Sequence, residues 1–197
     1  MKIYEVVLAL CAVAIVASTC TGRDAESSTP IAKATSSVAL PTIASQLATF
    51  RSGMTPPGSL AGPSSRDSLV RLFERALAKR DTVALQHLQI TREEFAFLYY
   101  PDSKMGRPPY ELDPDVMWMQ LQSQSDRGLR RLVAKYGGGK IRIRGLECLA
   151  PEPQNAVLLH QCGVRTSAVV GSAPGQLFGS IIEREGRFKF VGYANRL

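Results

Sequence analysis

Residues 66–88, RDSLVRLFERALAKRDTVALQHL, decide how the rest of the chain can fold. Apolar side chains recur in them at helical spacing and form one stripe, made of Leu69, Leu72, Phe73, Ala76 and Leu77. Asp81 interrupts this pattern and stands where the cap of a second short helix, 82–88, is expected. A stripe of this width has to be buried, so the sequence predicts that later segments pack over it.

The N-terminus has the pattern of a secretory signal peptide over residues 1–19. Lys2 precedes an apolar run, 6–19, that has the length of a signal-peptide hydrophobic region and is short for a membrane span. The next residues, Ala17-Ser18-Thr19-Cys20, resemble the lipobox of bacterial lipoproteins, whose cysteine is acylated; ordinary cleavage after Ser18 is the alternative. We expect export to the bacterial periplasm or envelope, with a lipid on Cys20 holding the protein at a membrane.

Residues 20–65 are predicted to form a flexible tether ahead of a folded domain at 66–197. From residue 25 onward the tether is rich in Ser, Thr, Ala and Pro and has few charges, a composition that buries too little apolar surface to fold. Segment 43–54 is an exception, because Ile43, Leu47, Phe50 and Met54 keep helical spacing. This segment is expected to dock as one or two helical turns.

The remaining sequence places helices before strands. Thr91 and Glu94 have the spacing of a capping box that starts a helix at 92–98, and Asp113-Pro114 starts a helix that runs to Tyr136. From residue 140 the period changes to two, which predicts strands at 141–146 and 157–165 and a hairpin at 177–193. The fold class is therefore α+β, with N-terminal helices packed on one face of an antiparallel sheet.

This order of elements resembles the nuclear transport factor 2-like superfamily, which includes the SnoaL and ketosteroid-isomerase-like families. The resemblance covers about residues 64–197 and rests on the opening SLVRLFERALAKRDTVAL and the closing EREGRFKFVGYANRL. It implies a curved, cone-like sheet wrapped around a pocket. In these families a strand lies between the second and third long helices, and residues 110–112 are the candidate for that strand.

The implied pocket would be lined by four aromatic side chains and one carboxylate, namely Tyr99, Tyr100, Asp102, Tyr110 and Trp118. Such a pocket can transfer protons, because a low dielectric raises a carboxyl pKa and a tyrosine hydroxyl can stabilise an enolate. The alternative is that Tyr99 and Tyr100 pack beneath a helix and Trp118 fills the core. Two functions follow. One is a non-catalytic domain that binds a small ligand or an envelope protein, which we expect; the other is a small cofactor-free enzyme of the SnoaL or ketosteroid-isomerase type.

The sequence gives no indication of a metal or cofactor site. His87 and His160 have no acidic or cysteine ligands beside them, and Gly137-Gly138-Gly139 is typical of the end of a helix. No Gly-x-Ser-x-Gly motif is present. We therefore expect neither a metal nor a cofactor.

The chain is basic, with a formal net charge of +7 over 197 residues. Its densest basic patch comprises Arg127, Arg130, Arg131 and Lys135, and Lys140, Arg142 and Arg144 follow it. The patch is either an anion-facing surface or a solvated helix face. An exported chain meets little nucleic acid, so nucleic acid is not an expected partner.

Cys148 and Cys162 are the expected disulfide, because Cys11 would leave with the signal peptide and Cys20 would carry lipid. A tight turn at 151–155 would place Cys148 nearer Val157. A longer loop over 151–159 would bring the two sulfurs opposite each other.

Overall fold

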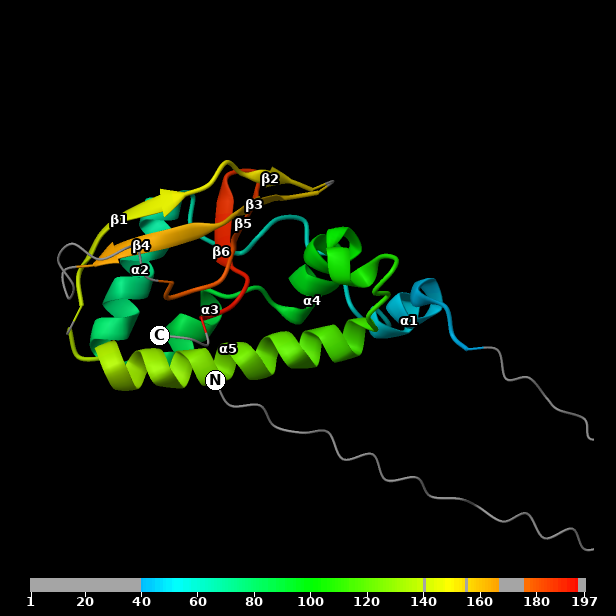
Figure 1. Cartoon of the computed structure of the whole chain (residues 1–197), viewed down its shortest axis with the longest axis horizontal. Helices are drawn as coiled ribbons and strands as arrows, with labels where there is room; N and C mark the ends of the chain where they lie inside the picture. The colour runs from blue at the N-terminus through cyan, green and yellow to red at the C-terminus, as the bar shows by residue number, and fades with distance from the viewer. Residues whose placement is uncertain (1–39, 140, 155, 167–175, 195–197) are drawn as a thin grey trace, which may run out of the picture. The chain divides into compact units, whose positions relative to one another are not determined.

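The computed structural model describes residues 40–139, 141–154, 156–166 and 176–194. Residues 1–39, and with them the expected signal peptide and Cys20, lie outside the described residues. The described part combines helices with antiparallel strands, as predicted for an α+β domain (Figure 1). Its α-helices are α1 (Ile43–Phe50), α2 (Arg66–Lys79), α3 (Thr82–His87), α4 (Arg92–Glu94) and α5 (Pro114–Tyr136).

Side chains cap the helices where the sequence predicts caps. Asp81 accepts a hydrogen bond from the Ala84 amide at the start of α3, at 2.9 Å, and Asp113 caps α5. Thr91 and Glu94 form the complete capping box. The helix expected at 92–98 is different after its first turn, because α4 continues as a π-helical segment, η1 (Phe95–Tyr99).

The strands form two separate hydrogen-bonded sheets, called here the first and second ladders, rather than the single antiparallel sheet expected. In the first ladder β1 (Ile143–Cys148) pairs with β4 (Cys162–Thr166). The second has the order β2 (Glu152–Pro153), β3 (Leu158–His160), β5 (Ile181–Arg184) and β6 (Arg187–Phe190). The single strand expected at 157–165 is therefore wrong, because the chain leaves the β5 edge after His160 and continues as β4 beside β1.

The β5–β6 hairpin is buried on both faces, so the expectation of helices on one face is corrected. Ile181 and Ile182 are neighbours in β5, and both are fully buried. Successive strand side chains point to opposite faces, so each isoleucine enters a different core. Ile181 packs in the core that includes α2, α3, β1 and β4, whereas Ile182 packs in the core that includes α1 and η1.

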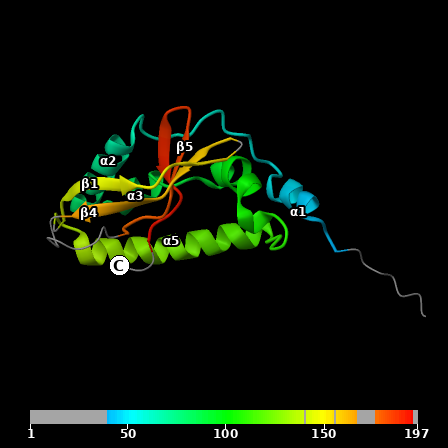
Figure 2. The ribbon, with the colours of Figure 1, turned by 45° about the horizontal axis from the view of Figure 1, so that its top comes forward.

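The long helix α5 contributes to both cores. Trp118 and Leu121 near its start pack against the Ile182 core, and Leu129 and Leu132 near its end belong to the Ile181 core. Figures 1 and 2 show α5 running beneath both sets of strands. Gly128 lies at a close approach, because a Cβ there would be 2.5 Å from the Ala194 carbonyl oxygen.

The folded unit begins at Leu40, which corrects the expected tether of 20–65 over its last part. The docking predicted for 43–54 is confirmed: α1 forms, and Phe50 is 2% exposed. Beyond α1, Leu60 is 1% exposed, and the Phe188 amide of β6 donates to the Pro63 carbonyl at 3.0 Å. Burial of these two apolar side chains and pairing with β6 fix a segment that composition alone marks as flexible.

Residues 110–112, the candidate for the strand between the helices, form no strand. They lie in the connection that follows two 3-10 turns, η2 (Tyr100–Asp102) and η3 (Lys104–Gly106). The chain between α3 and α4 instead reaches the sheet through a parallel bridge of Gln89 with Phe190.

Candidate functional site

Three of the five residues expected to line one pocket pack against a single phenylalanine ring. Tyr99, Tyr100 and Trp118 pack around the ring of Phe95, with centroid distances of 6.0, 5.7 and 5.1 Å. This is the core-packing alternative that the sequence leaves open. Tyr110 does not join them, because it is 64% exposed.

The two groups with the strongest catalytic potential already have structural partners. The Tyr100 hydroxyl donates to the Leu112 carbonyl at 2.7 Å. Burial, and secondarily the charge of Asp113, raises the pKa of that hydroxyl. The buried Asp102 carboxylate accepts from the Arg107 guanidinium at 2.7 Å. The Asp102 side chain is thus engaged by Arg107 and is 5% exposed.

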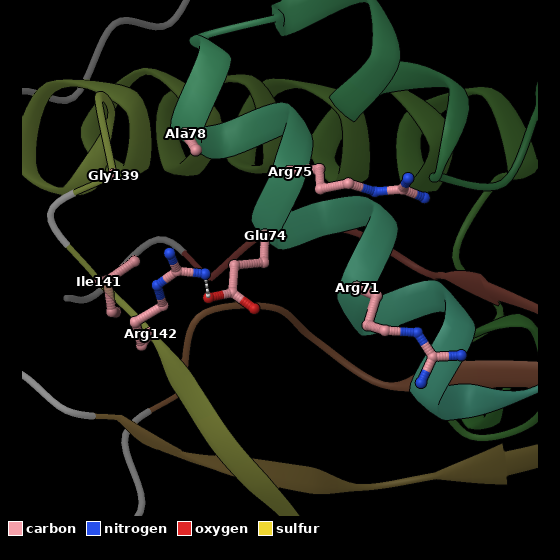
Figure 3. A pocket seen from close by; sticks show the side chains of 7 residues that line it. All are labelled: Arg71, Glu74, Arg75, Ala78, Gly139, Ile141 and Arg142. Carbon is pink, nitrogen blue, oxygen red and sulfur yellow. Dashed lines mark ion pairs between the residues drawn. The ribbon is translucent and has the colours of Figure 1, made fainter.

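A groove between α2 and the chain leading into β1 carries an excess of positive charge. Part of it is a hollow of about 400 Å³, which Figure 3 shows from close by. A smaller hollow of about 160 Å³ shares Arg71 and Glu74 with it and extends along β1. We call this site the α2–β1 groove. Its ionisable residues are Asp67, Arg71, Glu74, Arg75, Arg142 and Arg144.

Four of the groove's six ionisable side chains form two pairs, one across the groove and one pointing outward from α2. Arg142 faces Glu74 across the groove, with Nη1 and Oε1 3.6 Å apart. Arg71 and Arg75 extend from α2 in a common direction away from Arg142 (Figure 3). These two arginines are exposed and one helical turn apart, so their guanidinium groups can face the same ligand.

The basic patch predicted on α5 lies on the surface. Arg127, Arg130, Arg131 and Lys135 are all exposed. Lys140 lies outside the described residues, whereas Arg142 and Arg144, which follow the patch in sequence, line the α2–β1 groove. The patch therefore directly precedes in sequence only the β1 side of the groove, whose other side is α2.

A second hollow, of about 510 Å³, lies beside the buried lysine of β6. Lys189 donates to Glu94 Oε2 at 2.9 Å, and both side chains are 3% exposed. We call this hollow the Lys189 cavity. Its lining comprises Ala61, Gln86, His87, Gln89, Ile90, Thr91, Trp118, Gln122 and Lys189.

A chain of hydrogen bonds orients one amide of the Lys189 cavity. The Tyr193 backbone amide donates to Ser125 Oγ at 2.9 Å, and the Ser125 hydroxyl donates to Gln89 Oε1. The hydroxyl accepts from the backbone N–H with a lone pair and still has its own proton to donate to the glutamine oxygen. The NH2 group of Gln89 is thereby placed on the side away from Ser125.

His160 and Glu183 form a further buried contact that the sequence does not reveal. Nε2 of His160 lies 2.6 Å from Glu183 Oε2. The two residues are on the paired strands β3 and β5, so strand pairing brings them together. The Nδ1 atom of His160 is buried and has no partner among the described residues.

Sequence reasoning overlooked Lys189, although its pattern could have identified it. In Arg187-Phe188-Lys189-Phe190 the lysine alternates with two phenylalanines, so on a strand it points away from them. With both faces of the hairpin covered, that position is buried. A lysine inside a short aromatic strand is therefore a signal for a buried charge that needs a partner.

Neither a metal cluster nor a membrane span occurs in the described ranges. No group of three histidine, cysteine or acidic residues there could hold a metal ion. None of the helices described is long and apolar enough to cross a bilayer. Comparison of the chain with protein-family models, curated proteins and solved structures finds no match.

Proposed function

We propose that this protein is an exported, lipid-anchored envelope protein whose folded unit binds an anionic ligand and is not a catalyst. The observation that carries the proposal is the charge of the α2–β1 groove, which is lined by four arginines and only two acidic side chains. Glu74 lies within ion-pair distance of one of those arginines, Arg142. Arg71 and Arg75 project together from α2, and paired guanidinium forks suit carboxylate or phosphate oxygens.

Two contacts favour binding over catalysis. A proton-transfer enzyme of the ketosteroid-isomerase type needs a carboxylate that can act as a base and a tyrosine hydroxyl that faces the substrate. Here the Asp102 carboxylate is held by Arg107 at 2.7 Å, so it is not free to accept a proton from a substrate. The Tyr100 hydroxyl is occupied by a backbone carbonyl. An enzyme would have to break both contacts.

We also propose that the folded unit is a divergent member of the nuclear transport factor 2-like superfamily with a cone-like sheet. The order of helices followed by antiparallel strands supports this relationship. The missing strand at 110–112 and the division into two ladders are departures from the family pattern.

The anion proposal is tested by calorimetric titration of the purified protein with inorganic pyrophosphate. A second arm measures co-sedimentation with vesicles of neutral phospholipid, with and without anionic phospholipid, and so separates a free anion from a headgroup. Replacing both Arg71 and Arg75 with alanine should weaken binding about tenfold, which is the loss of about 1.4 kcal/mol. The matched control removes the same charge from α5, as Arg130→Ala with Arg131→Ala.

The control variant should change the affinity much less than the groove variant. Equal losses in the two variants would mean that net charge, rather than the groove, attracts the anion. Absence of binding to both pyrophosphate and anionic vesicles would contradict the proposal.

A further inference from the structure

We infer that the Lys189 cavity is a second binding site, and that its ligand is a neutral polyhydroxylated molecule, a saccharide. The cavity shares no lining residue with the α2–β1 groove. Its volume of about 510 Å³ is within the range of small-molecule sites, roughly 300–1,000 Å³. The inference therefore stands whether or not the groove binds anions.

The charge of the cavity argues for a neutral ligand. Lys189 is paired with Glu94, so an entering anion would meet an ammonium group that is already neutralised and a carboxylate that repels it. Within the described residues Glu94 is the single hydrogen-bond partner of the ammonium group. An ammonium group has three N–H donors, so it can still donate to a neutral oxygen.

The amides of the cavity argue for hydroxyl groups. Gln86, Gln89 and Gln122 line it together, and a primary amide both donates and accepts hydrogen bonds. Hydroxyl groups have the same double capacity, so several amides can bind a ligand that carries many of them. The Gln89 amide is additionally oriented by Ser125, which reduces the entropy lost when a ligand is bound.

Trp118 adds an apolar surface to this polar lining. Its indole contacts the ring of Phe95, with a centroid distance of 5.1 Å, and the residue also lines the cavity. A sugar ring has an apolar face of C–H groups that can pack on an indole while its hydroxyl groups bond to neighbouring amides. A purely apolar ligand would leave the lysine and glutamine donors without partners.

Trp118 also provides the measurement, because it is the only tryptophan of the chain. Its emission should report occupancy of the cavity when the purified protein is titrated with maltose, cellobiose and N,N′-diacetylchitobiose. Inorganic pyrophosphate serves as the anion arm. We expect a saturable change of emission with at least one disaccharide and no change with pyrophosphate.

Two substitutions on α5 localise the effect. Gln122→Ala removes a half-buried amide from the cavity, whereas Gln124→Ala removes an exposed amide two residues further along the helix. The first should weaken saccharide binding about tenfold and the second should leave it unchanged. Far-UV circular dichroism melting of both variants checks that each is folded.

The groove variant Arg71→Ala with Arg75→Ala should retain saccharide binding, which separates failure of this inference from failure of the anion proposal. No emission change with any of the three saccharides would overturn the inference. An equal loss of affinity in Gln122→Ala and Gln124→Ala would also overturn it, as would a response to pyrophosphate alone.

Discussion

Glu94 and Lys189 lie 95 positions apart in the chain and form an ion pair with Nζ and Oε2 2.9 Å apart, both side chains 3% exposed. Glu94 also accepts from the backbone amides of Ala61, at 3.0 Å, and Thr91, at 2.8 Å. One carboxylate therefore joins the segment before α2, the start of α4 and strand β6. The buried charges are compensated by this set of contacts.

Breaking this pair should destabilise the protein strongly. We expect Lys189→Met to lower the free energy of unfolding by about 3–5 kcal/mol, because it leaves the Glu94 carboxylate buried without its counter-charge. Glu94→Gln should have a similar cost, because it leaves the Lys189 ammonium buried without its counter-charge and replaces one of the two accepting oxygens with a donor. The double variant, Lys189→Met with Glu94→Gln, should lose about 1–3 kcal/mol less free energy of unfolding than the sum of the two single losses. Urea unfolding measures all three variants.

An exposed ion pair provides the control for this experiment. Arg92 and Asp115 are 3.1 Å apart, with side chains 47% and 61% exposed. Asp115→Asn should change stability by about 1 kcal/mol or less. If Lys189→Met lowered the free energy of unfolding as little as Asp115→Asn does, the buried pair would not be important for stability.

The disulfide should hold the first ladder together. Cys148 and Cys162 are directly opposite in the β1–β4 register and are bonded, as the longer-loop alternative predicts. With a sequence separation of 14, replacing both with serine should cost about 3 kcal/mol. Peptide mapping after alkylation without reductant should recover the two cysteines as one linked species. Recovery of both as alkylated thiols would contradict the bond.

Gly128 should not tolerate alanine, although alanine favours helices by about 1 kcal/mol. A Cβ there would lie 2.5 Å from the Ala194 carbonyl oxygen and 2.9 Å from the Tyr193 carbonyl oxygen. We expect Gly128→Ala to lower stability by about 1–3 kcal/mol in urea unfolding, since α5 and the chain after β6 have to separate. The control is Ser123→Ala on the exposed face of the same helix, which should be neutral within about 0.5 kcal/mol. A stabilised Gly128→Ala variant would contradict the close approach.

Buried tyrosines should make the protein sensitive to alkali. Burial raises the pKa of Tyr193 far above its ordinary value, and its hydroxyl donates to the Leu85 carbonyl at 2.6 Å. Because the folded-state pKa is raised, the contribution of Tyr193 to stability is complete below about pH 10, the pKa of an unfolded tyrosine. It is lost as the pH rises above that value, by up to about 1.4 kcal/mol per pH unit.

Ultraviolet absorbance of the phenolate measures this effect. Tyr193 should ionise only when the protein unfolds, so its absorbance change should coincide with the loss of circular dichroism. Tyr193→Phe should reduce the absorbance change that accompanies unfolding by the contribution of one tyrosine. Ionisation of all tyrosines near pH 10 in the folded protein would contradict the burial of Tyr193.

Local signals made most helices predictable. Caps at Asp81, Thr91 and Asp113 act within three residues of themselves, so their helix starts can be read from the sequence. Strand partners depend on distant residues. The division of 157–165 between two ladders follows from where β1 and β5 lie, which no local pattern contains.

Scattered apolar residues explain the error in the tether. Phe50 and Leu60 stand among serines, prolines and glycines, and Leu60 has no periodic apolar neighbours. Their burial depends on the Ile182 core and on pairing with β6, neither of which is a local property.

The candidate sites could not be predicted from local patterns either. Arg142 and Arg144 are recognisable in the sequence as basic residues, but their position opposite α2 requires the tertiary fold.

The most direct test of the central claim is the salt dependence of pyrophosphate affinity, measured for the natural protein and for Arg71→Ala with Arg75→Ala. Salt screens exposed charges, so affinity of the natural protein should fall steadily as ionic strength rises. In the double variant the affinity at low salt should be about tenfold weaker, and its dependence on salt should be shallower. Pyrophosphate binding that is absent, or that is identical in the two proteins at every ionic strength, would contradict an anion-binding groove between α2 and β1.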